Sequence, residues 1–390
     1  MSELRPDTLA VRGGLARSGF EETAEALYLT SGFVYSSAEE AEAAFKEEVD
    51  RFVYSRYGNP TVAMFEERMR LLEGTEACFA TGSGMAAVFV ALAALLGKGD
   101  RVVAARGLFG SCFVILDEIL PRWGVETVFV DGPDLDQWRE ALSVPTTAVF
   151  FESPSNPMQE LVDVRAVCDL AHASGAQVVV DNVFGTPVFS RPLEQGADVI
   201  VYSATKHIDG QGRTLGGAVL GTAEFINGPV RNLMRHTGPS MSPFNAWVLL
   251  KGLETLRLRV ERMAASALEI ARTLEAHPRV SRVVYPWLES HPQHELARAQ
   301  MLGGGTVVTF EVAGGKDEAF ALMNALEVID ISNNLGDSKS LITHPATTTH
   351  RRLGEEARRR IGITDGVLRV SVGLEDVRDL VDDLVQALQA

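Results

Sequence analysis

From about residue 76, short apolar runs rich in Val, Ile, Phe and Ala alternate with stretches of helical periodicity such as Val164–Ser174. Each run is only a few residues long and continuously apolar, which is typical of strands buried on both faces. Strands separated by helices predict a mostly parallel sheet with helices on both sides. We therefore expect one large α/β domain with a seven-stranded sheet, formed by Ala77–Thr81, Arg101–Ala105, Thr127–Asp131, Ala148–Glu152, Gln177–Asp181, Asp198–Tyr202 and Gly217–Gly221.

A longer helical pattern extends from Pro243 to about His277, with apolar residues at helical spacing and Arg and Glu between them. Its length suits a single helix that links two domains. The rest of the chain predicts a smaller α+β domain with two strands and two helices, Thr306–Val312, Leu368–Val372, Asp317–Leu326 and Asp376–Leu388.

Residues 1–60 are rich in Glu and Ala and lack a clear core pattern. A segment of this kind cannot bury a face of its own, so we expect an arm that packs against another surface. The sequence thus predicts three parts: an N-terminal arm at 1–60, the large domain at 61–257 and the C-terminal domain at 258–390.

Composition narrows the class of protein. The 390 residues include 36 Lys and Arg against 52 Asp and Glu, a net charge of −16, which disfavours binding to nucleic acid or an acidic membrane surface. The longest apolar run, Met85–Gly97, is shorter than the roughly 20 residues that a membrane span needs, and the polar N-terminus offers no secretory segment. Three cysteines without CxxC spacing suggest buried thiols in a reducing compartment. We expect a soluble, cytoplasmic enzyme.

Three chemically distinctive segments each lie at the carboxyl end of a predicted strand. Thr81–Ala87 (TGSGMAA) opens an apolar helix, so its backbone N–H groups can approach a phosphate. Asp181 ends a later strand, and Lys206 lies just past the next one, close to Ser203 and Thr205. Ligands collect at the carboxyl ends of strands in such sheets, so all three segments can face one crevice.

This combination meets the needs of pyridoxal phosphate (PLP). The cofactor requires a lysine for a Schiff base, an acid that keeps its pyridine nitrogen protonated, and donors for its phosphate. Lys206, Asp181 and the segment Thr81–Ala87 supply them. Each feature is weak alone, because most lysines are solvated surface charges. Together they predict a PLP enzyme with Lys206 as its catalytic residue.

A dinucleotide-binding oxidoreductase is the main alternative. Gly82–Ala87 matches G-x-G-x-x-G/A, and Tyr202 with Lys206 matches a Tyr-x-x-x-Lys pair. The first motif needs an acid about 20 residues further on, at the end of the next strand, where this chain has Ala104–Arg106. The Tyr-x-x-x-Lys pair should lie on a helix, but here it ends a predicted strand. We therefore disfavour this interpretation.

A family resemblance rests on five motifs spread along the chain, Tyr54–Thr61 (YSRYGNPT), Ser83–Met85 (SGM), Ser153–Pro157 (SPSNP), Ser203–Lys206 (SATK) and Leu368–Gly373 (LRVSVG). With these motifs the chain resembles, over essentially its whole length, the γ-family of PLP enzymes of cysteine and methionine metabolism, the trans-sulfuration enzymes family. The resemblance implies the PLP-dependent transferase fold of the aspartate aminotransferase type (fold type I), with the cofactor in the 61–257 domain.

The resemblance also implies roles for individual residues. Tyr54 and Arg56 would bind the cofactor phosphate of a neighbouring subunit, so active sites would be shared within a homo-oligomer, expected to be a homotetramer. Asn156 would lie near the cofactor ring and the substrate carboxylate, and Arg369, with Ser340 beside it, would hold the substrate α-carboxylate. Further cofactor contacts would come from Ser83, Gly84, Met85, Phe109, Asp181, Ser203 and Thr205.

Departures from the family pattern indicate the subtype. Phe109 stands where many members have a Tyr stacked on the ring, so stacking remains but a phenol is lost. Val114 and Lys339 stand where trans-sulfuration members place an Arg and a Glu for the two charges of cysteine or cystathionine. Ser111 stands where methionine γ-lyases carry a Cys. Lys339 is instead a candidate cation for the carboxylate of a succinyl ester.

These departures favour γ-replacement of O-succinyl-L-homoserine or O-acetyl-L-homoserine by sulfide, giving L-homocysteine for methionine biosynthesis. Cystathionine γ-synthesis and a methionine or cystathionine γ-lyase activity are the alternatives within the family, and a non-catalytic scaffold is the alternative outside it. No metal site is expected, since His291 and His294 flank Pro292 with no third ligand in view.

Overall fold

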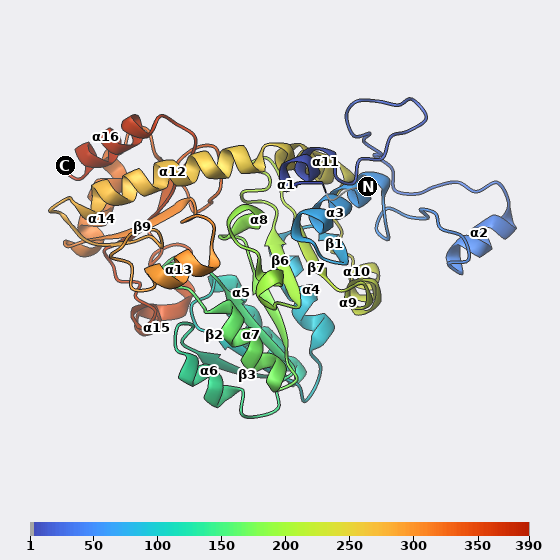
Figure 1. Ribbon diagram of the computed structural model, residues 1–390, viewed down its shortest axis with the longest axis horizontal. Helices are drawn as coiled ribbons and strands as arrows, with labels where there is room; N and C mark the ends of the chain where they lie inside the picture. The colour runs from blue at the N-terminus through green and yellow to red at the C-terminus, as the bar shows by residue number, and fades with distance from the viewer. Residues whose placement is uncertain (1–3, 390) are drawn as a thin grey trace.

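The computed structural model describes residues 4–389 and contains a seven-stranded and a five-stranded sheet (Figure 1). The large sheet has the order β1-β7-β6-β5-β4-β2-β3. All seven strands that the apolar runs predict are present, each within one residue of its expected bounds. They are β1 Ala77–Thr81, β2 Arg101–Ala105, β3 Glu126–Val130, β4 Ala148–Glu152, β5 Gln177–Asp181, β6 Val199–Ser203 and β7 Gly217–Gly221.

Pairing in the large sheet is parallel from β6 through β5, β4 and β2 to β3, whereas β7 runs antiparallel to both of its neighbours. Side chains of one strand therefore point alternately to two buried faces. In β4, Ala148 and Phe150 belong to one core with α4 (Gly84–Leu95), and Val149 and Phe151 belong to another with α6 (Leu135–Ala141) and α7 (Val164–Ala173). The sheet is covered on both sides, as expected for a parallel sheet.

The remaining helices of the large domain are a packed pair of longer helices and a set of short segments that lie between the strands along the chain. Helix α3 (Pro60–Glu73) packs against α11 (Pro243–Glu254) and contributes Phe65 and Met69 to a third core. Shorter segments are α5 Gly110–Val114, the π-helical turn η1 Ile115–Ile119, η2 Leu120–Trp123, α8 Thr186–Phe189, η3 Pro192–Gln195, α9 Ala223–Phe225, η4 Ile226–Val230 and α10 Arg231–Thr237.

The expectation of one helix from Pro243 to His277 is wrong, because the helix is interrupted at Thr255. Helix α11 ends there and α12 (Leu256–Glu275) begins. The guanidinium of Arg259 donates to the carbonyl of Gly252 at 2.7 Å, so a carbonyl near the end of α11 is satisfied by a side chain. The first half of α12 packs in the core of the large domain and its second half in that of the smaller domain. Figure 1 shows α12 running between the two.

The smaller domain is a mixed sheet of order β10-β11-β12-β9-β8 covered by α12, α14 and α16. The expected strands and helices are present, and three short strands were not expected from the sequence. The elements are β8 Val280–Val284, α13 His294–Gln300, β9 Val307–Val312, α14 Gly315–Ala325, β10 Asp330–Ile331, β11 Leu341–Thr343, η5 Arg351–Leu353, α15 Gly354–Arg360, β12 Val367–Ser371 and α16 Val377–Ala387.

The N-terminal segment divides into an anchored part and a projecting part. Helix α1 (Pro6–Arg12) packs on α3 and α11, and the buried carboxylate of Glu25 binds Arg68 and Lys251. This part packs against the large domain of its own chain. The part around α2 (Ala38–Phe45) extends away from the body (Figure 1). Within residues 4–389, no helix is both long and apolar enough to span a membrane.

Candidate active site

A cavity of about 310 Å³ opens at the carboxyl ends of β4, β5 and β6. This is the edge of the sheet at which the sequence places its distinctive segments. Ten of the residues proposed from the sequence line it: Ser83, Gly84, Met85, Phe109, Asn156, Asp181, Ser203, Thr205, Lys206 and Arg369.

Lys206 lies in the turn that follows β6, with its side chain in the cavity. Its Nζ donates to Oδ1 of Asn334 at 2.6 Å. Burial, and to a smaller extent the positive charge of Arg369, lower the pKa of Lys206 to about 8. About a tenth of the amine is therefore neutral at pH 7, which provides the form that a nucleophile or a general base requires.

Arg369 projects from β12 of the smaller domain into the same cavity and is almost completely buried. Its guanidinium donates to Oδ1 of Asn156 at 3.0 Å and to the carbonyls of Asn333 and Asn334 at 2.9 and 3.1 Å. Its Nε is buried without a hydrogen-bond partner, and no carboxylate within residues 4–389 forms an ion pair with it.

A buried cation without an anionic partner is costly to a folded protein. Burial accordingly lowers the pKa of Arg369 to about 10. A planar guanidinium that remains charged and unpaired in a cavity is well suited to a carboxylate ligand, which would relieve this cost.

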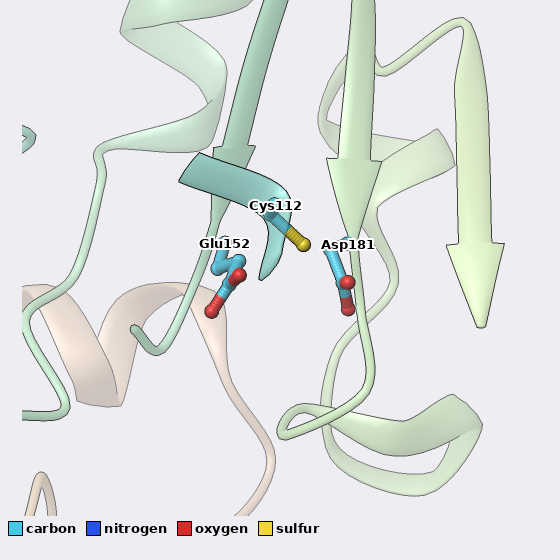
Figure 2. A group of neighbouring side chains, drawn as sticks. All are labelled: Cys112, Glu152 and Asp181. Carbon is cyan, nitrogen blue, oxygen red and sulfur yellow. The ribbon is translucent and has the colours of Figure 1, made fainter. Parts of the chain in front are cut away.

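Two acids end neighbouring strands at the floor of the cavity. Glu152 on β4 and Asp181 on β5 are in register, and Cys112 of α5 lies between them in Figure 2. Burial raises the pKa of Asp181 to about 7, and burial together with the nearby Asp181 raises the pKa of Glu152 well above its usual range. Glu152 accepts the backbone N–H of Phe109 at 2.7 Å, which fixes the turn that carries this ring.

Sequence reasoning missed Glu152, although a signal was present. Two successive predicted strands end in an acid, and parallel strands bring such ends together. One ligand atom from each of Cys112, Glu152 and Asp181 lies within 4.8 Å of the others, an arrangement that could also hold a metal ion.

The N-terminus of α4 forms the opposite end of the cavity. Ser83 is its N-cap and accepts the backbone N–H of Ala86. A Cβ at Gly84 would lie 2.4 Å from Cβ of Ser203, so this turn can approach Ser203 only with a glycine. Free N–H groups at a helix start, next to two hydroxyl-bearing residues, Ser203 and Thr205, make a place where a phosphate fits.

Three other candidates lie outside this cavity. The Ser340 hydroxyl donates to Glu375 at 2.9 Å and accepts the N–H of Gly373 at 2.8 Å, so this side chain is committed to a turn of the smaller domain. This arrangement argues against Ser340 as a direct substrate ligand. Tyr54 and Arg56 belong to the N-terminal segment, where the Arg56 guanidinium donates to the carbonyl of Arg235. They do not line the cavity of their own chain.

The two residues that suggested the subtype are also placed by the structure. Val114 lines a neighbouring hollow rather than the cavity itself. Lys339 has a largely exposed side chain, 3.5 Å from the carboxylate of Asp337, and lines neither space. Lys339 is therefore a poor candidate for binding a succinyl carboxylate.

Comparison with known proteins decides the family. A family model described as Cys/Met metabolism PLP-dependent enzyme matches residues 7–389. The chain belongs to this family. It is 66% identical over 385 residues to the O-succinylhomoserine sulfhydrylase of Mycobacterium tuberculosis, covering 98% of this chain and 95% of that one. It is 50% identical over 385 residues to the O-succinylhomoserine sulfhydrylase of Pseudomonas aeruginosa, with the same coverage.

A solved structure shares the fold. A putative O-acetylhomoserine (thiol)-lyase from Campylobacter jejuni, which carries a pyridoxyl-lysine phosphate, superimposes with a TM-score of 0.95 at 31% identity over 99% of this chain and 100% of that one. The enzyme is PLP-dependent, and its fold is that of the γ-family, as the sequence motifs predict. The dinucleotide-binding oxidoreductase interpretation is excluded by this membership.

The cavity fits the cofactor on its own evidence. It contains a lysine with a lowered pKa, a partly buried acid with a raised pKa on the neighbouring strand, and a helix N-terminus from which side-chain bulk is excluded at Gly84. These are the three functional groups that the aldehyde, the pyridine nitrogen and the phosphate of PLP respectively require.

Proposed function

We propose that this enzyme replaces the acyloxy group of an O-acyl-L-homoserine, preferentially the succinyl ester, with sulfide to give L-homocysteine. The observation that carries the proposal is the buried, unpaired guanidinium of Arg369, which shares one cavity with Lys206 and Asp181. An amino acid substrate brings the carboxylate that Arg369 lacks. The names of the relatives from M. tuberculosis and P. aeruginosa support sulfide as the acceptor and succinyl as the acyl group.

Within this proposal, Lys206 would hold the cofactor covalently and Asp181 would keep its ring nitrogen protonated. Phe109, whose N–H donates to Glu152, would pack against the ring. Ser83, Gly84 and Met85 at the start of α4, together with Ser203 and Thr205, would hold the phosphate. When bound, PLP supplies an electron sink that stabilises negative charge on the substrate carbon skeleton.

The chain's own residues then position the substrate and move protons. Arg369 and Asn156 bind the α-carboxylate, so the Cα–H bond is held at the end of the cavity that contains Lys206. Nζ of Lys206, once free, takes the Cα proton and moves a Cβ proton. The bond from Cγ to the acyloxy oxygen breaks, and a bond from Cγ to sulfur forms. Asn334 accepts a hydrogen bond from Nζ and so keeps the amine in place between these transfers.

The rate at which the apoenzyme takes up PLP should depend on pH through Lys206. Only the neutral amine can attack the aldehyde, and with a pKa of about 8 its neutral fraction is one half near pH 8 and levels off above about pH 9. We expect the growth of the visible absorption band, followed by stopped flow from pH 6 to 10, to accelerate with pH, with an inflection near pH 8 and a plateau above about pH 9. An Arg369→Gln variant should move the inflection to higher pH, because one source of repulsion is lost. A wild-type rate that still rises tenfold per unit above pH 9 would contradict this assignment.

Sulfide should be preferred over cysteine by at least about 100-fold in kcat/KM, about 2.7 kcal/mol at 1.36 kcal/mol per decade. Cysteine brings an ammonium and a carboxylate that lose hydration on entry, and an unmatched buried charge is costly. Val114 offers its carboxylate no partner, and the cation in the lining of the hollow around Val114 is the largely exposed Arg352. None of the described residues in that lining is an acid that could receive the ammonium. Competition between the two acceptors for one ester, with homocysteine and cystathionine quantified, measures the ratio.

Val114→Arg should narrow that ratio by adding a partner for the cysteine carboxylate. Val114→Leu is the matched control, since it adds bulk without charge and should not favour cysteine. Cystathionine as the dominant product of the wild-type enzyme would replace the sulfhydrylase proposal with cystathionine γ-synthesis.

We further propose that the enzyme is a homotetramer whose active sites are shared between subunits. Tyr54 and Arg56 would then reach the cofactor phosphate of a neighbouring subunit. The segment around α2 supports this, because Val34 and Phe45 are 90% and 65% exposed and lack cover from their own chain. Large apolar side chains that are exposed on a projecting segment are typical of an interface.

Subunit mixing tests the shared site. Arg56→Ala and Lys206→Ala homo-oligomers should each be inactive, and reassembly of the mixture should restore part of the activity, because a hybrid contains a site with both native residues. Mixing Lys206→Ala with Asp181→Ala is the control, since both residues line one cavity within a chain. Every site in that mixture should lack either Lys206 or Asp181, so no activity should return. Activity would return only if these two residues of one site came from different subunits. No recovery despite demonstrated exchange would place Arg56 outside the neighbouring site.

A further inference from the structure

A second hollow of about 480 Å³ lies beside the active-site cavity. The two spaces share three lining residues, Met85, Ser111 and Thr349. The two spaces therefore lie next to each other, with these three residues at their boundary. None of the cofactor or carboxylate roles assigned above uses this space, apart from Met85 at the boundary.

The walls of the hollow are largely apolar. They come from α4, from α5 and the π-helical turn that follows it, and from the segment that ends in η5. The apolar lining side chains are Met85, Ala86, Phe89, Val114, Ile115, Ile119 and Leu353. Such walls suit methylene groups and offer nothing to a charge.

One positive charge stands in the lining, and it belongs to Arg352 of η5. Its side chain is about 71% exposed, and Nη2 lies 3.8 Å from the carboxylate of Glu118, which is a loose contact. His350 also lines the hollow, but burial and then Arg369 lower the pKa of His350 to about 4, so this ring is neutral. Its Nε2 faces the carbonyl of Asn156 at 3.1 Å. Lys339, the cation suggested by the sequence, is absent from the lining.

We propose that this hollow binds the acyl part of the homoserine ester and that Arg352 binds its terminal carboxylate. The inference rests on the proposed function and adds the residue that selects the acyl group. A succinyl group has two methylenes followed by a carboxylate, which matches apolar walls with one cation beyond them. An acetyl group ends at its methyl and leaves Arg352 without a partner.

In this arrangement the hollow is used twice, first by the departing acyl group and then by the entering sulfide. The acyl group occupies the hollow until the bond from Cγ to oxygen breaks. Departure of the dicarboxylate then empties the hollow next to Cγ, and a small anion such as hydrosulfide can enter. Free succinate should therefore inhibit, because it can return to Arg352, whereas acetate should not.

The test compares O-succinyl- and O-acetyl-L-homoserine, each with sulfide, in the wild-type holoenzyme and in Arg352→Ala. We expect Arg352→Ala to raise KM for the succinyl ester about tenfold or more, as for loss of a charge-assisted hydrogen bond. Its KM for the acetyl ester should not change, and inhibition by succinate should be lost. Arg352→Lys should recover part of the succinyl preference. The visible band of the bound cofactor reports that each variant is intact.

Two further variants sharpen the comparison. Lys339→Ala is the matched control, because it removes an exposed cation outside the hollow and should change neither ester. Glu118→Gln removes the carboxylate that competes for Arg352, so KM for the succinyl ester should fall while that for the acetyl ester stays the same.

The outcomes separate this inference from the proposed function. A wild-type enzyme that forms homocysteine but uses both esters equally, or an Arg352→Ala variant that weakens both esters alike, would overturn the role of Arg352 and leave the sulfhydrylase proposal intact. The same holds if Lys339→Ala alone removes the succinyl preference. Failure of the wild-type enzyme to form homocysteine from either ester would instead overturn the proposed function.

Discussion

Lys206→Ala is expected to abolish homocysteine formation, with a loss in kcat of at least about a thousandfold. The variant removes both the covalent attachment of PLP and the amine that moves the Cα and Cβ protons, and general base catalysis alone is typically worth 10²–10⁴-fold. The visible band of covalently bound cofactor should disappear with it. Product analysis and absorption spectra of the purified variant measure both effects.

The same variant should retain weak binding of free PLP, because the phosphate contacts at α4 and Asp181 remain. Lys251→Ala is a suitable control, since this lysine lies on α11, away from the cavity, and pairs with Glu25 of the N-terminal segment. A wild-type protein that is colourless and stays so after addition of PLP would remove the basis of the catalytic assignment. Full activity in Lys206→Ala would do so equally.

Arg369→Ala should lower kcat/KM for the ester by about 30-fold to several thousandfold. Truncating one partner of a buried charge pair typically costs about 2–5 kcal/mol, and each 1.36 kcal/mol is tenfold. The kcat/KM of Arg369→Lys should lie between those of Arg369→Ala and the wild type, because lysine keeps the charge but lacks the planar fork that binds a carboxylate bidentately. Steady-state kinetics with the succinyl ester measure the effect.

Three further measurements distinguish a substrate ligand from a structural residue. The absorption band of bound PLP should be nearly unchanged in Arg369→Met, because Arg369 is assigned to the substrate. The Tm of this variant without substrate should change little, because two effects oppose each other. Loss of a buried charge without an ionic partner is stabilising, whereas Asn156, Asn333 and Asn334 lose a hydrogen-bond donor. The succinyl and acetyl esters should suffer equally, since both carry the same α-carboxylate. Loss of cofactor from the variant would contradict the assignment.

The large sheet could be predicted almost completely from the sequence. Most of its strands are continuous apolar runs because both faces of the sheet are covered. Strand β4 is the simplest case, since all five of its residues are buried. The strands of the smaller sheet were harder to predict for the opposite reason. Strand β8 exposes Ser281 and Arg282, and β10 has only two residues, both exposed, so neither leaves an apolar run in the sequence.

The predictions from sequence were wrong or incomplete where tertiary contacts determine the local structure. The pattern continues through Thr255 because Leu253 and Leu256 are both buried, yet the backbone turns there as Arg259 binds the Gly252 carbonyl. Periodicity reports which residues are buried and not whether the helix axis is continuous. Helix α1 was missed as an anchored element because Ala10 is its single buried residue, too little to make a pattern.

For the site, residue chemistry alone found Lys206, Asp181 and the start of α4, because each follows a strand of the same sheet. Arg369 comes from a different sheet, far along the chain, and no spacing rule links it to Lys206. The family resemblance was needed to propose it, and the structure brings the two side chains into one cavity. Arg352 was not found, since an Arg in an exposed turn carries no signal until its neighbours are known.

Asn334 sets a limit on how this enzyme can be redesigned. Its side chain accepts a hydrogen bond from Lys206 and its backbone carbonyl accepts one from Arg369, so one residue of a short loop supports both the proton carrier and the carboxylate ligand. A mutagenesis library that varies this loop would disturb chemistry and recognition together, and its variants could not be interpreted separately. In the hollow beside the cavity, by contrast, Phe89, Val114, Ile115, Ile119 and Leu353 line that space and not the cavity itself. Engineering toward new acyl groups or new thiols should therefore vary these five residues and leave residues 333–335 untouched.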